Sequence, residues 1–202
     1  MKAAQPRASQ RIQRPTTSRE LALRTHPLVF GVVLFLVADL MIFAGLLATY
    51  FTLRQLPGQW PPAGVRLDET SAAVGTAMLA ASSATMLFTT HYLARNAFTT
   101  ARVWLGATIL LGTTFVLLTI HGWSTATFRI DSHAYGSVYF ATTGFHALHV
   151  LAGVLLLVML FFNMNAAAFE RNRRAGAEAI GYFWHFVFAI WLLVWGSIFV
   201  IR

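Results

Sequence analysis

The chain has 202 residues, of which 57% are hydrophobic and only 11% are charged. A soluble domain usually carries about a quarter charged residues, so most of this chain has no water to face. The absence of cysteine excludes disulfides, thiolate-bound metals and iron–sulfur clusters. The formal net charge is +8, but the basic residues lie at the ends of apolar runs. This pattern indicates a membrane protein and argues against nucleic acid as a partner.

A polar, basic stretch covers residues 1–25, and we expect it to be a flexible cytoplasmic tail. It is long, and no small-residue cleavage site follows it, so we do not interpret it as a signal peptide. Residues 26–202 are expected to form one transmembrane domain. Five apolar runs in it can each cross the hydrocarbon layer of about 30 Å as a helix; they are Pro27–Leu53, Thr70–Leu93, Val103–His121, Gly136–Phe162 and Ala179–Ile201. The sequence therefore predicts an all-α bundle of five transmembrane helices.

Two local features stand out in the first half of this domain. The Pro- and Gly-rich segment 56–62 ends the first helix, and its Trp60 is a candidate anchor at the membrane interface or contact to lipid or another subunit. Ala73, Ala77, Ala81 and Thr85 repeat at every fourth position of the second run. Such a smooth stripe is typical of close helix packing, and we predict ordinary packing for it.

The positions of the basic residues predict how the chain is oriented across the membrane. Eleven of the fifteen basic residues precede the first run or lie in the second and fourth connections; they are Lys2, Arg7, Arg11, Arg14, Arg19, Arg24, Arg95, Arg102, Arg171, Arg173 and Arg174. Only Arg54, Arg66, Arg129 and Arg202 fall on the other side. Because basic residues stay in the cytoplasm, we expect the N-terminus inside and the C-terminus outside.

Asp39 is the one carboxylate within the apolar runs, about 18 Å into the first helix. A charge at that depth is costly, so Asp39 should be neutral or partnered. It is either a proton-exchanging group or a hydrogen-bonded structural residue. The expected partner is a histidine of the fourth or fifth helix. His146 matches its depth best, His149 lies one turn further along the same face, and His185 lies closer to the inner surface.

Three histidines at membrane depth are also candidate ligands for a metal or haem. However, two histidines one turn apart commonly form hydrogen bonds to neighbouring helices. Neither Cys nor Glu accompanies His146, His149 or His185, and no di-iron Glu-x-x-His pattern is present. We therefore predict no metal, no cofactor and no catalytic residue in this chain.

Several segments carry a resemblance to a known family; they are Tyr135–Val150, which contains Phe-His-Ala-Leu-His-Val, then Tyr182–Val187 with Trp191, and Ala38–Leu46 with Tyr50, Phe51 and Trp60–Pro62. They resemble subunit III of the haem-copper terminal oxidases, the cytochrome c oxidase subunit 3 family, in its short five-helix bacterial form. The resemblance covers nearly all of residues 26–202.

This resemblance implies a multi-pass protein of the bacterial plasma membrane that belongs to the aerobic respiratory chain. It implies a non-catalytic subunit beside catalytic subunit I and subunit II, which bind the haem and copper. The chain would support proton uptake, bind phospholipids in its clefts and prolong turnover. Trp184 and Trp191, within the resembling segments, join Trp60 as candidate contacts to lipid or to another subunit.

The chain also departs from the family pattern. Asp39 replaces the usual Glu, Phe188 replaces the usual Asp, and Thr119 and Gly122 stand where Gln and Glu are usual. These losses leave open a subunit III-like accessory protein of a nitric oxide reductase. A free-standing proton-coupled transporter using Asp39 and a haem- or metal-binding enzyme using the histidines are further alternatives. Cytochrome c and quinol both remain open as the electron donor.

Overall fold

The computed structural model describes residues 27–164 and 171–201, without the side chains of residues 171–173, so the predicted tail lies outside the described residues. The elements are α2 (Pro27–Arg54), α3 (Glu69–Ala94), α4 (Phe98–Thr125), α5 (Ala134–Asn163), α6 (Arg171–Trp195) and η2 (Gly196–Val200), a short π-helix. Five helices are long and apolar enough to cross a membrane. The all-α class and the five transmembrane helices predicted from the sequence are therefore confirmed.

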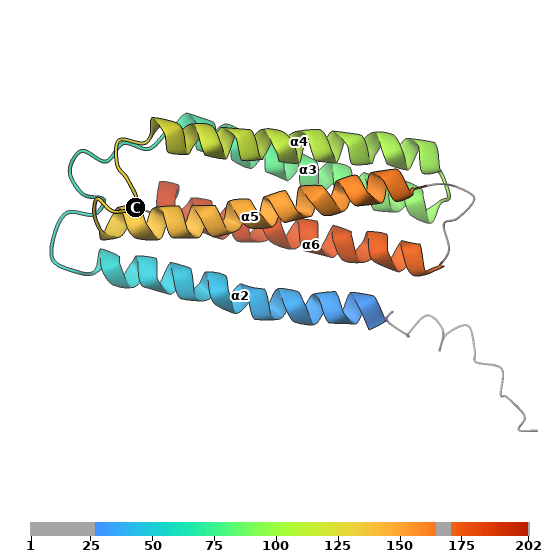
Figure 1. Cartoon of the computed structure of the whole chain (residues 1–202), viewed down its shortest axis with the longest axis horizontal. Coiled ribbons are helices and arrows are strands. Elements are labelled where there is room, and N and C mark those ends of the chain that lie inside the picture. Colours follow the sequence, from blue (N-terminus) through green and yellow to red (C-terminus); the bar gives the residue numbers. More distant parts are fainter. Residues whose placement is uncertain (1–26, 165–170, 202) are drawn as a thin grey trace, which may run out of the picture.

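The five helices run up and down along one axis (Figure 1). α5 and α6 lie in the middle, with α2 on one side and the α3–α4 pair on the other. α6 packs against α2, α3 and α5, whereas α5 packs against α2, α4 and α6. We call the end of the bundle where α2 begins the inner end, and the opposite end the outer end.

Two helices extend well beyond the apolar runs that predicted them. α4 covers Phe98–Thr125 rather than Val103–His121, and α6 begins at Arg171 rather than at Ala179. The 28 residues of α4 have a length of about 42 Å, whereas the hydrocarbon layer is about 30 Å thick. The extra turns continue into the polar headgroup region, where an apolar pattern is no longer required.

The outer ends of α3 and α5 are closed by side chains that cap the first turn. Asp68 precedes α3, and its carboxylate accepts hydrogen bonds from the Ser71 amide at 3.0 Å and the Ser71 hydroxyl at 2.5 Å. His133 precedes α5, and its Nδ1 accepts a hydrogen bond from the Gly136 amide at 2.8 Å. These bonds satisfy backbone donors that a helix start leaves free.

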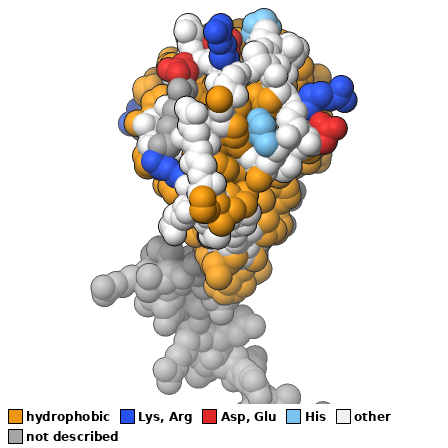
Figure 2. All heavy atoms as spheres, turned by 90° about the vertical axis from the view of Figure 1, so that its left-hand side faces the viewer, with side chains coloured by type: hydrophobic (Ala, Val, Ile, Leu, Met, Phe, Trp, Pro, Cys, Tyr) orange, Lys and Arg blue, Asp and Glu red, His pale blue; other side chains and the backbone are white. Residues whose placement is uncertain are grey.

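The surface of the bundle separates into polar ends and apolar sides. Figure 2 shows the outer end, where charged and histidine side chains gather while hydrophobic side chains cover the flank behind them. Large exposed hydrophobic residues follow the length of α2, among them Phe30, Leu34, Phe35, Met41 and Ile42. An apolar flank of this kind requires lipid or another subunit around it.

Most of the small-residue stripe of α3 lies on the surface of this chain. Ala73, Ala77 and Ala81 are exposed, whereas Thr85 faces α4 and forms a 2.8 Å hydrogen bond with Thr108. The buried side of α3 instead carries larger or polar residues, such as Leu79, Ser82 and Met86. The stripe therefore gives α3 a flat, exposed face.

Candidate functional site

Asp39 and His149 form a buried polar pair between α2 and α5. Asp39 is 4% exposed, and its Oδ1 lies 3.2 Å from His149 Nε2. The other ring nitrogen, His149 Nδ1, lies 2.8 Å from the carbonyl oxygen of Phe145, one turn earlier on α5. The prediction that a histidine of the fourth or fifth helix partners Asp39 is thus confirmed.

The hydrogen bond to Phe145 determines how the protons of this pair are placed. A carbonyl oxygen can only accept, so His149 Nδ1 must carry a proton and donate it. Nε2 then faces Asp39 either as the acceptor of a carboxylic acid proton or as the N–H of an imidazolium beside a carboxylate. In both forms one proton lies between Oδ1 and Nε2, and the pair as a whole is neutral.

His149, and not His146, is the partner of Asp39. Asp39 follows the start of α2 by about 18 Å, while His149 and His146 precede the end of α5 by about 21 Å and 26 Å. The estimate from the sequence measured the depth of His146 from the outer end of an apolar run, and it took that end as the membrane surface. Because α5 has 30 residues, or about 45 Å, that assumption placed His146 too close to the inner end.

His146 is instead enclosed by aromatic rings. It has no exposed surface, and it stacks on Trp191 with ring centres 4.9 Å apart. Phe115 meets the imidazole edge-on at 5.7 Å, and Phe43 lies at 6.3 Å. Neither ring nitrogen of His146 has a hydrogen-bond partner within the described part of the chain. His146 therefore fills space in the core and lies beside the Asp39–His149 pair without bonding to it.

His185 belongs to a different contact, between α6 and α3. Its Nδ1 lies 2.6 Å from the Ser83 hydroxyl oxygen. His185 is about 9 Å beyond Ala179, where the apolar run of α6 begins. In the described ranges, no three His, Cys, Asp or Glu side chains gather closely enough to hold a metal ion.

Two of the three tryptophans proposed as outward contacts are buried. Trp184 and Trp191 are 1% and 3% exposed, so their interpretation as contacts to lipid or another subunit is wrong. Their indole N–H groups donate to Ser82 Oγ at 3.2 Å and to Thr76 Oγ1 at 2.8 Å, which permits their burial. Trp60 is half-buried at the outer end and packs on Tyr50 and Tyr135.

An apolar groove of about 510 Å³ runs from the inner half of the bundle to His149. We call it the α2–α5–α6 groove, after the three helices that line it. Its lining residues are Leu28, Val32, Phe35, His149, Ala152, Leu156, Gly176, Ala179, Ile180 and Phe183. The histidine of the buried pair is thus the polar group of an otherwise hydrophobic wall.

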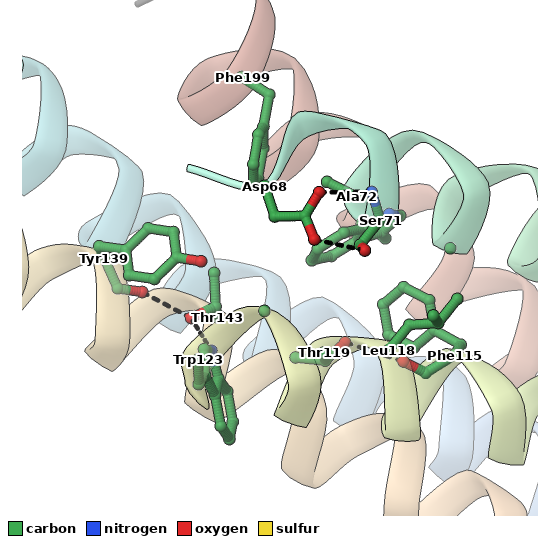
Figure 3. Close-up of a pocket in the computed structure, with 13 residues that line it drawn as sticks. Asp68, Ser71, Ala72, Phe115, Leu118, Thr119, Trp123, Tyr139, Thr143 and Phe199 are labelled. Carbon is green, nitrogen blue, oxygen red and sulfur yellow. Dashed lines mark hydrogen bonds between the residues drawn. The ribbon is translucent and has the colours of Figure 1, made fainter. Parts of the chain in front are cut away.

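A smaller pocket of about 30 Å³, with several polar side chains on its wall, lies near the outer end, between α3, α4, α5 and α6 (Figure 3). Asp68, Thr119 and Tyr139 face it, and Trp123 Nε1 donates to Thr143 Oγ1 at 3.2 Å on its wall. It has room for about two water molecules. Sequence reasoning missed Asp68 and Tyr139, although Asp68 lies two residues before an apolar run and is a suitable helix-capping residue.

Comparisons with known proteins agree with this architecture. The family described as "Cytochrome c oxidase subunit III" matches residues 18–201. "Probable cytochrome c oxidase subunit 3" of Nocardia farcinica is 35% identical over 188 residues, 89% of this chain and 90% of that protein. "Cytochrome c oxidase subunit 3" of Corynebacterium diphtheriae is 35% identical over 190 residues, with the same shares of both chains.

A mammalian relative extends the similarity beyond bacteria. "Cytochrome c oxidase subunit 3" of Dugong dugon is 34% identical over 177 residues, 84% of this chain and 68% of that protein. The family match includes α2 to α6 in full, and therefore both halves of the Asp39–His149 pair. The chain belongs to the cytochrome c oxidase subunit III family.

Proposed function

We propose that this chain works beside catalytic subunit I and subunit II of a proton-translocating oxidase, without a redox centre of its own. As a family member, it is subunit III of a respiratory haem-copper oxidase and a multi-pass protein of the bacterial plasma membrane. Haem and copper belong to the partner subunits in this proposal, and cytochrome c, named in its relatives, is the proposed electron donor.

The contacts that His146, His149 and His185 already make support the view that this chain holds no haem. Both ring nitrogens of His149 are engaged, by Asp39 and by Phe145. His185 uses Nδ1 for Ser83, and His146 is enclosed by rings. These three settings are separate, so they do not offer a common ligand set to an iron or copper ion.

The Asp39–His149 pair at the wall of the α2–α5–α6 groove is the observation that carries the proposed role. The pair joins α2, which packs mainly on the middle helices, to α5. Its shared proton offers the complex a neutral polar link, in which the proton can move between Asp39 Oδ1 and His149 Nε2 without changing the net charge of the pair. We infer that it supports proton uptake and the durability of turnover by keeping α2 in place.

The α2–α5–α6 groove is the proposed lipid site. Its volume of about 510 Å³ lies within the range of about 300–1,000 Å³ that ligand pockets have. An almost fully apolar wall suits a phospholipid acyl chain. Arg95, Arg102 and Arg174 lie at the inner end of the bundle, which supports the proposed cytoplasmic orientation of that end and an inner-leaflet lipid.

Purification in mild detergent through a tag on this chain tests the proposal. We expect haem-bearing subunits to come with it, and we expect the complex to consume oxygen with reduced cytochrome c. The separated chain should show no haem or copper absorption. Co-purification with nothing, or with a complex that reduces nitric oxide but not oxygen, would contradict the proposal. Stoichiometric haem in the separated chain would contradict its non-catalytic part.

A further inference from the structure

One side of the bundle carries several polar side chains between two membrane-spanning helices. A groove of about 230 Å³ between α3 and α6 is lined by Leu87, Thr90, Glu178, Gly181, Tyr182 and His185. We call it the α3–α6 groove. Four of these six residues can form hydrogen bonds through their side chains. The exposed side of α2, by contrast, presents large apolar residues such as Phe30, Leu34 and Met41.

Tyr182 and His185 lie within the apolar run of α6, whereas Glu178 lies in the turn that precedes it, at the level of the headgroups. The run begins at Ala179, so His185 lies about 9 Å beyond its start. A hydrocarbon layer of about 30 Å therefore contains His185. Lipid tails at that depth offer no partner to a polar group, which makes its exposure to them costly.

Three groups in this groove have bonding capacity left. Glu178 is exposed and makes no hydrogen bond or ion pair with another described residue. His185 uses Nδ1 for Ser83, and its Nε2 has no partner in the described part of the chain. Tyr182 is 51% exposed. In the hydrocarbon layer, His185 Nε2 needs a partner from outside this chain, and the Glu178 carboxylate is available to a cation beside it.

The surroundings of the groove are flat enough for another helix. Ala84 lies one turn from Leu87 on α3, Ala189 lies one turn from His185 on α6, and both alanines are exposed. Small residues let two helix backbones approach closely. The mean hydropathy of α3 is 1.4, against 2.0 to 2.6 for the other four spans, which suits a protein contact better than a lipid contact.

We propose that the α3–α6 groove docks a transmembrane helix of a neighbouring oxidase subunit, one that presents a cation or hydrogen-bond donor to Glu178 and a polar side chain to His185. The inference rests on the proposed function, since it requires that the chain works within a complex. A second copy of this chain fits poorly. A two-fold axis along the membrane normal would bring the two Glu178 carboxylates together at one depth.

The test uses the whole complex, purified through a tag on this chain, and measures haem per tagged chain. Ala84→Trp places a large ring on the proposed docking face and should lower this ratio at least tenfold. Ala44→Trp is the matched control, because Ala44 is an exposed alanine on α2; it should leave the ratio unchanged. Gel filtration and circular dichroism of the tagged chain check that each variant folds.

The variant Glu178→Leu distinguishes a protein partner from lipid, and it tests the proposal even if Ala84→Trp does not fold. It removes the carboxylate that would bind the cation of the partner helix, so the haem per tagged chain should fall several-fold. Lipid would accept leucine, and the ratio would then stay or rise. An unchanged ratio in Ala84→Trp and Glu178→Leu, or an equal loss in Ala44→Trp, would overturn the docking site. A wild-type chain that brings no haem would instead overturn the proposed function itself.

Discussion

The indole ring of Trp184 on α6 lies directly against Gly153 on α5. A Cβ atom added at Gly153 would come within 2.8 Å of two carbons of this ring. Trp184 is 1% exposed, and its N–H is held by Ser82 on α3, so the ring has little freedom to move. The absence of a side chain at Gly153 therefore sets how closely the two middle helices pack.

Gly153→Ala should destabilise the bundle because the new methyl group meets a ring that is fixed on its other side. Overpacking of this kind costs about 1–3 kcal/mol of the free energy of unfolding. Thermal unfolding of the purified chain in detergent measures the loss. Gly144→Ala, on the same helix and with nothing within 4 Å of its added Cβ, should unfold at or above the wild-type temperature. Equal unfolding temperatures of the two variants would contradict the close approach.

Asp68 should make stability depend on acid pH. Hydrogen bonds from the Ser71 hydroxyl and amide hold the pKa of Asp68 below its ordinary value of 3.8. Because the pKa is lower in the folded state, the carboxylate stabilises the fold above about pH 4. This contribution is lost as the pH falls through the folded-state pKa.

Asp68→Asn tests this pH dependence, because asparagine still caps a helix but carries no charge. In thermal unfolding of the chain, we expect a loss on the order of 1 kcal/mol at pH 7, which shrinks as the pH falls below about 4. Asp131→Asn removes the same charge from a 3.7 Å ion pair in which the Asp131 side chain is 76% exposed. That control should change stability little at either pH. A difference from wild type that does not shrink on acidification would speak against the carboxylate.

Removal of this chain should leave the redox centres of the complex intact, since the catalytic subunit binds them in the proposed function. We expect initial oxygen reduction close to that of the full complex, followed by faster inactivation during turnover or weaker proton pumping. The visible spectrum and a time course of oxygen consumption measure both. Loss of haem from the catalytic subunit after a clean removal would count against this prediction, unless a failure of assembly is the cause.

The sequence alone predicted the five transmembrane helices and singled out Asp39. A hydrocarbon layer of about 30 Å requires long apolar runs, and a carboxylate inside one is conspicuous. The ends of α4 and α6 could not be predicted, because helices continue into the headgroup region with polar residues. The choice of His149 over His146 depended on where the helices end.

Contacts between helices were the other feature that could not be predicted from the sequence. Trp184 and Trp191 resemble interfacial tryptophans by residue type, yet Ser82 and Thr76 on α3 allow both to be buried. The α2–α5–α6 groove combines residues from three helices far apart in sequence, so no single segment indicates it. Glu178 lay just outside the predicted fifth run, and it belongs to a helix because α6 begins earlier, at Arg171.

Asp39 and His149 should each be uncharged, with the shared proton on Asp39. Burial in a membrane disfavours two separate charges, and an uncharged His149 can donate its Nδ1 proton to Phe145 while Nε2 accepts the proton of Asp39. The infrared difference between wild type and Asp39→Asn should then contain a carboxylic acid band that shifts in heavy water. Carboxylate bands in its place would show an ion pair.

Substitution of Asp39 separates a structural role from a proton-exchanging one. The side-chain amide introduced by Asp39→Asn can still donate an N–H to His149 Nε2, so this variant should assemble and turn over almost normally if the role is structural. Asp39→Leu leaves Nε2 buried without a donor, which costs about 1–3 kcal/mol, and should assemble poorly. Leucine at both Asp39 and His149 removes the unpaired Nε2 as well, so this double variant should regain part of the thermal stability. If Asp39→Asn assembles normally but stops proton movement, Asp39 is a working proton group and the structural role is refuted.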